Sequence, residues 1–258
     1  MRKDVPFIDK IVGLNCWTTP NRGIRAVLKE NLEDFIVEEI LQNGSIVSLE
    51  KPRLQFSGYE GLFTHFILIK KGIGNFEASW IISRVLKTSP SLIFYSGNKD
   101  KDALTVQRAA VWGIPPEKLL AIELPPSIKI LSPIRELRRI HVGDHYGNRF
   151  TITVRKIPSS DLELLIVTIN SINKKETIPN FFGYQRFGIM RPISHYVGKL
   201  LLLRKYKEAI ISYLSAPGLF DSEDLIDAKQ KVREEKFARA LRAFPRRNFL
   251  FENLILKK

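Results

Sequence analysis

The segment Phe63-Thr-His-Phe-Ile-Leu-Ile-Lys70 decides the fold. It is a short run of apolar and β-branched residues, which is typical of a strand buried inside a sheet. Asn75 is predicted to cap a helix, because apolar residues recur after it at helical intervals, at Ala78, Ile81, Ile82 and Val85. A second short strand is predicted at 92–95. Strands alternating with a helix that is apolar on one face indicate a mixed α+β domain.

Further elements are predicted on both sides of this segment. Residues 24–40 read as two short strands around a polar turn. Thr105 is predicted to cap a helix over 106–112, which Gly113 and the Pro115-Pro116 pair would end. Residues 149–154 alternate strictly, so Phe150, Ile152 and Val154 are expected to face inward. Residues 161–172 are predicted to be helical.

The last part of the chain has a different character. From Ser194 onward the pattern is helical, with helices predicted at 194–203, 206–214 and 222–243. The simplest boundary falls just after Gly188. We therefore predict a mixed domain over residues 1–188 and a helical, basic segment over residues 189–258.

Composition excludes several classes of protein. Apolar residues make up 44% and charged residues 26% of the 258 positions, which is ordinary for a soluble globular protein. No window approaches 18 uninterrupted apolar residues, so we expect no membrane span. The charged first residues are unlike a secretory signal, so a cytoplasmic location is expected.

Metal and disulfide chemistry are not expected either. The single Cys16 excludes an internal disulfide framework and a Cys-rich zinc site. His141 and His145 are four residues apart, but Gly143 and a turn make a helical pair of metal ligands an unfavourable interpretation.

The charge balance points to a polyanionic partner. The net charge is +14, and the isoelectric point is near 9.8. Nucleic acid is the commonest partner of so basic a domain, and charge for solubility alone is the alternative. A DNA-binding protein is disfavoured because no recognition-helix signature is found.

Two segments gather polar residues among glycines and aromatics. The first, Ser96-Gly-Asn-Lys-Asp-Lys-Asp-Ala-Leu-Thr-Val-Gln107, follows a predicted strand, where active-site loops are common. Its Asp100 or Asp102 could serve catalysis, or could merely cap the next helix in a solvated turn. A phosphate-binding loop is disfavoured because no Gly-Lys-Ser/Thr follows.

The second segment is Asn180-Phe-Phe-Gly-Tyr-Gln-Arg-Phe-Gly188. Three Phe, a Tyr, a Gln and an Arg in nine residues suit stacking on bases and contact with phosphates. An aromatic turn that lines the core is the alternative, because Phe is more often buried than functional.

Together these segments resemble the TruD family of tRNA pseudouridine synthases. Gly97-x-Lys-Asp-Lys101 followed by Thr105-x-Gln107 matches one family hallmark, and Asn180–Gly188 matches the other. Weaker similarity, archaeal in character, covers most of residues 10–215, including Leu28–Glu39 and Val142–Phe150. The resemblance implies a mixed, mainly antiparallel sheet of the pseudouridine synthase type with flanking helices, followed by the start of the family's helical insertion domain.

The resemblance also implies an activity and a site. The activity is isomerisation of a uridine in tRNA, at position 13, to pseudouridine, with Asp100 as the catalytic carboxylate and with no cofactor and no metal. Covalent attack and proton abstraction by this carboxylate stay open. Phe182 would stack on the flipped base, Asn180 would line the pocket and Lys29 would pair with Asp100. The predicted substrate-binding residues are Phe182, Asn180, Lys29, Lys99, Gln185 and Arg186.

The chain departs from the family in length. Known members are longer, and residue 258 falls within the region similar to the helical insertion. A fragment or a shortened form is therefore expected, and a non-catalytic RNA-binding protein is the rival interpretation. The sequence does not indicate an oligomeric state.

Overall fold

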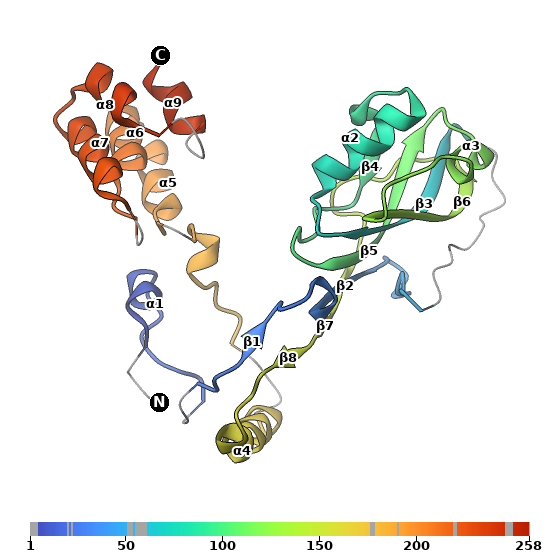
Figure 1. Ribbon diagram of the computed structural model, residues 1–258, viewed down its shortest axis with the longest axis horizontal. Coiled ribbons are helices and arrows are strands. Elements are labelled where there is room, and N and C mark those ends of the chain that lie inside the picture. Colours follow the sequence, from blue (N-terminus) through green and yellow to red (C-terminus); the bar gives the residue numbers. More distant parts are fainter. Residues whose placement is uncertain are drawn as a thin grey trace. The chain divides into compact units, whose positions relative to one another are not determined.

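The computed structural model describes residues 5–19, 21, 23–50, 54, 61–175, 179–189, 191–218, 221–245 and 250–257. Contacts divide the chain into two compact units (Figure 1). One is Ile24–Leu162, termed here the sheet unit. The other joins Met1–Gly23 to Glu163–Lys258 and is termed the helical unit. Residues 163–188 thus group by contacts with the helical unit, and their assignment to a functional domain stays a prediction.

In its described residues the sheet unit contains strands of two to nine residues and two α-helices. Its elements are β1 (Val27–Leu28), β2 (Phe35–Ile40), β3 (Phe63–Lys71), α2 (Asn75–Leu86), β4 (Ile93–Tyr95), β5 (Leu104–Trp112), α3 (Pro116–Leu120), β6 (Ile128–Glu136), β7 (Gly147–Ile152) and β8 (Val154–Arg155). The predicted strands within 24–40, at 63–70 and at 92–95 are thereby confirmed.

The main sheet has the order β6-β3-β5-β2-β7, and β4 also pairs with β5. β2 runs parallel to β5, whereas the other pairs, including the separate β1–β8 ribbon, are antiparallel. β3 pairs with the whole of one edge of β5, so β2 and β4 share the other edge. The predicted α+β class with a mixed, mainly antiparallel sheet and flanking helices is confirmed.

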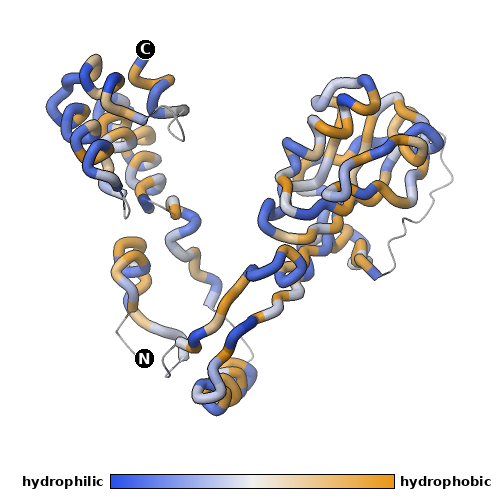
Figure 2. Tube along the Cα trace, in the orientation of Figure 1, coloured by the Kyte–Doolittle hydropathy of each residue, from blue (hydrophilic) through white to orange (hydrophobic). Residues whose placement is uncertain are grey.

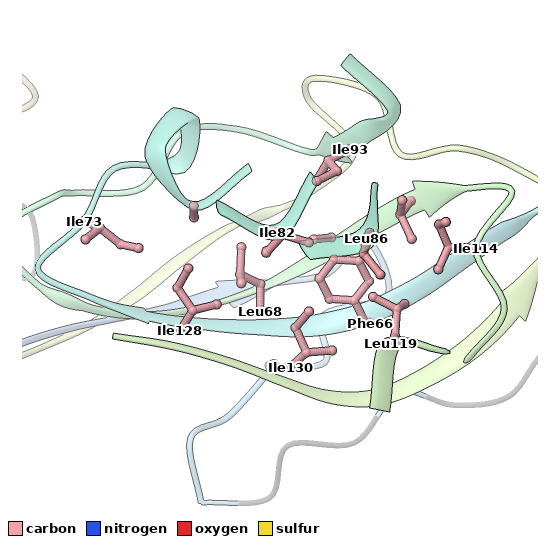
Figure 3. Packing of buried hydrophobic residues seen from close by; sticks show 13 residues of the cluster. Phe66, Leu68, Ile73, Ile82, Leu86, Ile93, Ile114, Leu119, Ile128 and Ile130 are labelled. Atoms are coloured by element: carbon pink, nitrogen blue, oxygen red, sulfur yellow. The ribbon is translucent and has the colours of Figure 1, made fainter. Parts of the chain in front are cut away.

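Both helices of this unit cover the same face of the sheet. Ile82 and Leu86 of α2 and Leu119 of α3 pack with Phe66 and Leu68 of β3 in one buried cluster (Figure 3). The buried stripe of α2 contains Ala78 and Ile82, as predicted. Val85 is 42% exposed, because the stripe is centred on residues 75, 79, 82 and 86.

The prediction of a helix over 106–112 is wrong, because these residues form β5, a central strand of the sheet. Six of its nine residues are buried, on both faces of the sheet. Such a strand loses the apolar–polar alternation that would reveal it, and a short apolar run can then be read with either periodicity. Its β-branched residues Thr105, Val106 and Val111 favour the strand.

The predicted inward face of residues 149–154 is also not buried. Phe150, Ile152 and Val154 are 51%, 46% and 44% exposed. Residues 147–152 do form a strand, β7, in which Phe150 lies opposite Val37 and Ile152 lies opposite Phe35 of β2. Alternate residues of this strand therefore lie on the same face, as predicted. β7 is an edge strand of the main sheet, which explains why its apolar side chains stay half open to solvent.

The helical unit contains α1 (Phe7–Ile11), α4 (Leu162–Asn173, whose first residue belongs to the sheet unit), α5 (Ser194–Leu202), α6 (Tyr206–Ser215), α7 (Glu223–Arg233), α8 (Phe237–Ala243) and α9 (Leu250–Leu256). Its core gathers Leu214, Leu225, Val232 and Phe244. The single helix predicted over 222–243 is instead two, because Glu235 between α7 and α8 has φ +56°. α4 is mostly apolar yet buries none of its residues (Figure 2).

Among the described residues, no helix combines the length and the apolar character needed to cross a bilayer.

We expect the cluster under α2 to carry much of the stability of the sheet unit. Replacing Phe66, which is fully buried, by Ala removes a large side chain and leaves a cavity. Phe66→Ala should lower the free energy of unfolding by about 3–5 kcal/mol, measured by urea denaturation.

Phe76 of α2 is the matched control, because its ring is 79% exposed. Phe76→Ala should change the free energy of unfolding by no more than about 0.5 kcal/mol. Equal effects of the two substitutions would contradict the assigned core.

Candidate active site

The carboxylate of Asp100 lies at the surface of the sheet unit beside a lysine. The Nζ of Lys29 is 3.7 Å from Oδ1 of Asp100, and the two side chains are 33% and 43% exposed. The same Nζ lies 3.8 Å from the centre of the Phe35 ring, a cation–π contact. An accessible carboxylate thus faces solvent with an ammonium group held next to it.

The sheet explains why two residues 71 positions apart meet. β2 and β5 are parallel neighbours, with Ile36 opposite Leu104. The segments that lead into these strands therefore arrive at the same end of the sheet. Lys29 belongs to the first and Asp100 to the second. Lys29 has φ +54°, in the left-handed region, so the chain turns sharply at the residue that carries the ammonium.

Below the surface, the loop of residues 96–103 is tied to the sheet by a buried ion pair. The Nζ of Lys99 lies 3.0 Å from Oε2 of Glu39, and the side chains are 2% and 0% exposed. Ser96 donates a hydrogen bond of 2.6 Å to the same oxygen. The other carboxylate oxygen of Glu39 accepts from the backbone N–H of Arg108. Lys99 therefore directs its ammonium into the protein, toward β2.

Asn75 is the first residue of α2 and not its cap, which is Gly74, so the predicted capping role is wrong; its side chain holds the same loop instead. Asn75 donates from Nδ2 to the carbonyl of Gly97 at 3.2 Å, and its Oδ1 accepts from the backbone N–H of Lys99 at 3.4 Å. Because Asn75 is buried, these contacts are shielded from water.

Lys70, at the end of β3, is fully buried beneath the loop. Its ammonium donates to three carbonyl oxygens, those of Ile73 at 2.9 Å, Lys99 at 3.3 Å and Asp100 at 2.7 Å. Burial lowers the pKa of Lys70 to about 8, although the charge of Asp100 acts in the opposite direction. Lys99 adds to the lowering as a like charge.

The second predicted segment lies in the helical unit and forms a 3-10 turn at Tyr184–Arg186. Phe182 is 64% exposed, and the guanidinium of Arg186 lies 5.2 Å from the centre of its ring. Gly188 has φ +123°, and a Cβ there would lie 2.4 Å from the carbonyl oxygen of Arg191. The glycine that ends the segment is therefore required by its backbone.

A cavity of about 780 Å³ adjoins this turn. Its lining includes the rings of Phe181, Phe182 and Phe187 together with Lys175 and Cys16, which belongs to the N-terminal part of the helical unit. Asn180, Gln185 and Arg186 are exposed residues of the same segment. This region offers apolar rings beside cationic groups, a combination suited to a nucleobase and its phosphate.

The predicted site residues thus form two groups. Lys29 and Asp100 meet in the sheet unit, whereas the Lys99 ammonium is buried against Glu39, which disfavours its predicted substrate-binding role. In the helical unit Arg186 contacts the Phe182 ring, and Asn180 and Gln185 are exposed residues of the same segment. Sequence reasoning missed the residues that support the loop, Glu39, Lys70 and Asn75. A lysine at the end of a buried apolar run is the signal that could have identified Lys70. Among the described residues, no three His, Cys, Asp or Glu side chains gather to hold a metal ion.

Comparison with known proteins extends over nearly all of the chain. The family model described as "tRNA pseudouridine synthase D (TruD)" matches residues 11–258. A Methanosarcina barkeri protein named "Probable tRNA pseudouridine synthase D" is 33% identical over 246 residues, 93% of this chain and 53% of that protein. A Methanococcus vannielii protein of the same name is 35% identical over 230 residues, 88% of this chain and 58% of that protein.

A solved structure agrees in fold. The crystal structure of a candidate tRNA pseudouridine synthase D (TruD) from Methanosarcina mazei superposes with a TM-score of 0.77 at 31% identity, covering 98% of this chain and 56% of that one. The chain spans little more than half the length of these relatives. With the family model matching all but the first ten residues, the chain belongs to the TruD family.

Proposed function

We propose that the protein is a tRNA pseudouridine synthase that isomerises a uridine, at position 13, with Asp100 as its catalytic carboxylate. The observation that carries the proposal is the exposed Asp100 carboxylate, 3.7 Å from the Lys29 ammonium, on a loop fastened by buried polar contacts. Membership of the TruD family supplies the reaction. The tRNA substrate and a cytoplasmic location, where tRNA is found, belong to the same proposal.

The reaction suits a single positioned carboxylate. The N-glycosidic bond between N1 of uracil and the sugar breaks, the base turns, and C5 of the base bonds to the sugar; the hydrogen of C5 leaves as a proton and N1 takes up a proton. No group is gained or lost and no electrons are transferred, so acid–base or nucleophilic chemistry is sufficient. The Lys29 ammonium offsets the charge of the carboxylate where an RNA phosphate would also approach.

The base must leave its stack before it reacts, which costs a few kcal/mol. We propose that Phe182 offsets this cost by stacking, with Arg186 on the ring and Asn180 and Gln185 as polar neighbours. The exposed Phe182 ring supports this role, since a buried ring could not reach a base. The +14 net charge favours binding to the tRNA backbone.

The first test removes the charge of Asp100. Asp100→Asn keeps the shape of the side chain but cannot act as nucleophile or base. Release of tritium from tRNA labelled at C5 of uridine should fall at least about 10³-fold. The affinity for tRNA, measured by filter binding, should stay within about threefold.

The matched control is Asp102→Asn, which makes the same charge change at another exposed carboxylate of the loop. It should retain near-normal tritium release. An active Asp100→Asn variant would refute the catalytic role. A wild-type chain that binds tRNA but releases no tritium would favour the RNA-binding rival.

The second test removes the proposed stacking ring. Phe182→Ala should slow turnover about 10-fold or more, because base–aromatic stacking contributes about 1–3 kcal/mol. The melting temperature should hardly change, since the ring is already 64% exposed.

Phe7→Ala provides a control in the same unit, at a ring that is 72% exposed and lies outside the motif. It should leave turnover unchanged. A large loss of thermal stability in Phe182→Ala would instead identify Phe182 as a core residue.

A further inference from the structure

The ammonium group of Lys70 is fully buried and hydrogen-bonded only to the protein backbone. A lysine ammonium has three N–H donors, and all three point at backbone carbonyl oxygens rather than at a carboxylate. Two of these carbonyls belong to consecutive loop residues, Lys99 and Asp100. The shortest contact, 2.7 Å, is to the carbonyl of Asp100 itself.

This contact acts directly on the orientation of the carboxylate. The carbonyl carbon of Asp100 is bonded to the Cα that carries its side chain, so holding this carbonyl restricts the backbone torsions that aim the carboxylate. The other loop anchors act on earlier residues, because Ser96 binds Glu39 and Asn75 binds Gly97. Of the loop anchors named above, Lys70 alone contacts Asp100 itself.

Stability alone does not account for a lysine here. Taking an ammonium out of water costs several kcal/mol, and the lowered pKa of Lys70 reflects this cost. Its neighbours on β3, Phe66, Ile67 and Leu68, are apolar and fully buried. An apolar residue of similar length would avoid this penalty but would leave the carbonyls of Ile73, Lys99 and Asp100 without this donor, so the charge at this position serves to hold the backbone of the loop.

We propose that Lys70 is a positioning residue, whose buried ammonium clamps the backbone of Lys99 and Asp100 and so aims the Asp100 carboxylate at the substrate. The proposal rests on the catalytic role of Asp100 proposed above. Lys70 does not touch the substrate, since its side chain is fully buried.

The main test is Lys70→Met, which keeps the length of the side chain and removes its donors. We expect kcat for tritium release to fall about 10-fold or more, because a misaimed carboxylate loses effective concentration. KM for tRNA should stay within about twofold. Backbone amides of residues 97–103 should exchange hydrogen at least about 10-fold faster, while α2 amides should be unchanged.

Lys71→Met is the matched control, because Lys71 is the next residue of β3 and its exposed side chain pairs with Glu33. It should change neither kcat nor the exchange of the loop. Normal kcat and normal loop exchange in Lys70→Met would overturn the proposal. Faster exchange in α2 as well as in the loop would also overturn it, since Lys70 would then be a general core residue.

The pH profile gives a readout that a purely structural lysine would not produce. The charged groups acting on Lys70 are Asp100 and Lys99, and its pKa is about 8. As pH rises through this value the ammonium loses one of three donors, so kcat should decline. In Lys70→Arg, whose guanidinium keeps its charge, this decline should move to higher pH.

Lys29→Arg is the control at the other lysine beside Asp100. A decline that moves in Lys29→Arg but not in Lys70→Arg would overturn the role of Lys70. Absence of tritium release from the wild-type chain would refute the proposed function, and the catalytic part of this inference with it. Loop exchange would still decide whether Lys70 fixes the loop.

Discussion

Two buried charges, the ammonium of Lys70 and the carboxylate of Glu39, hold the loop that presents Asp100. Each is removed from water, and each recovers the lost hydration through hydrogen bonds to groups of the loop or beside it. Because both residues belong to strands of the central sheet, the loop inherits the rigidity of that sheet. An exposed carboxylate is thereby supported from beneath by a polar layer that solvent does not reach.

Sequence reasoning succeeded where one periodicity dominates. The amphipathic residues after Asn75 repeat at helical intervals, and the helix is confirmed. β3 and β5 are both buried on both faces, so neither shows the alternation that marks a strand. The run at 63–70 could still be identified because it is rich in β-branched and aromatic residues. The run at 106–112 was misread because its Gln107, Arg108, Ala109 and Ala110 favour a helix. The break at Glu235 was missed because the charged run at 233–236 is made of residues that a helix accepts, and a left-handed glutamate leaves no compositional signal.

Some residues of the candidate site could be identified from the sequence and others could not. Asp100 and Lys29 could be named through the family resemblance, and the parallel register of β2 and β5 gives their proximity a physical basis. The supporting role of Lys70 could not be named, because its three acceptors lie 3, 29 and 30 residues along the chain. Only the fold brings these carbonyls around one nitrogen. In the helical unit, Gly188 belongs to the sequence motif, and its backbone conformation and its close approach to Arg191 explain why glycine is needed there.

The left-handed backbone of Lys29 has a consequence for comparing related chains. A lysine in this conformation gives up about 1–2 kcal/mol that a glycine would not lose, and asparagine tolerates it better as well. Selection for stable folding alone would favour glycine or asparagine at position 29. A related chain that has lost the catalytic activity is therefore expected to carry glycine or asparagine at this position, where the backbone is less strained than with lysine.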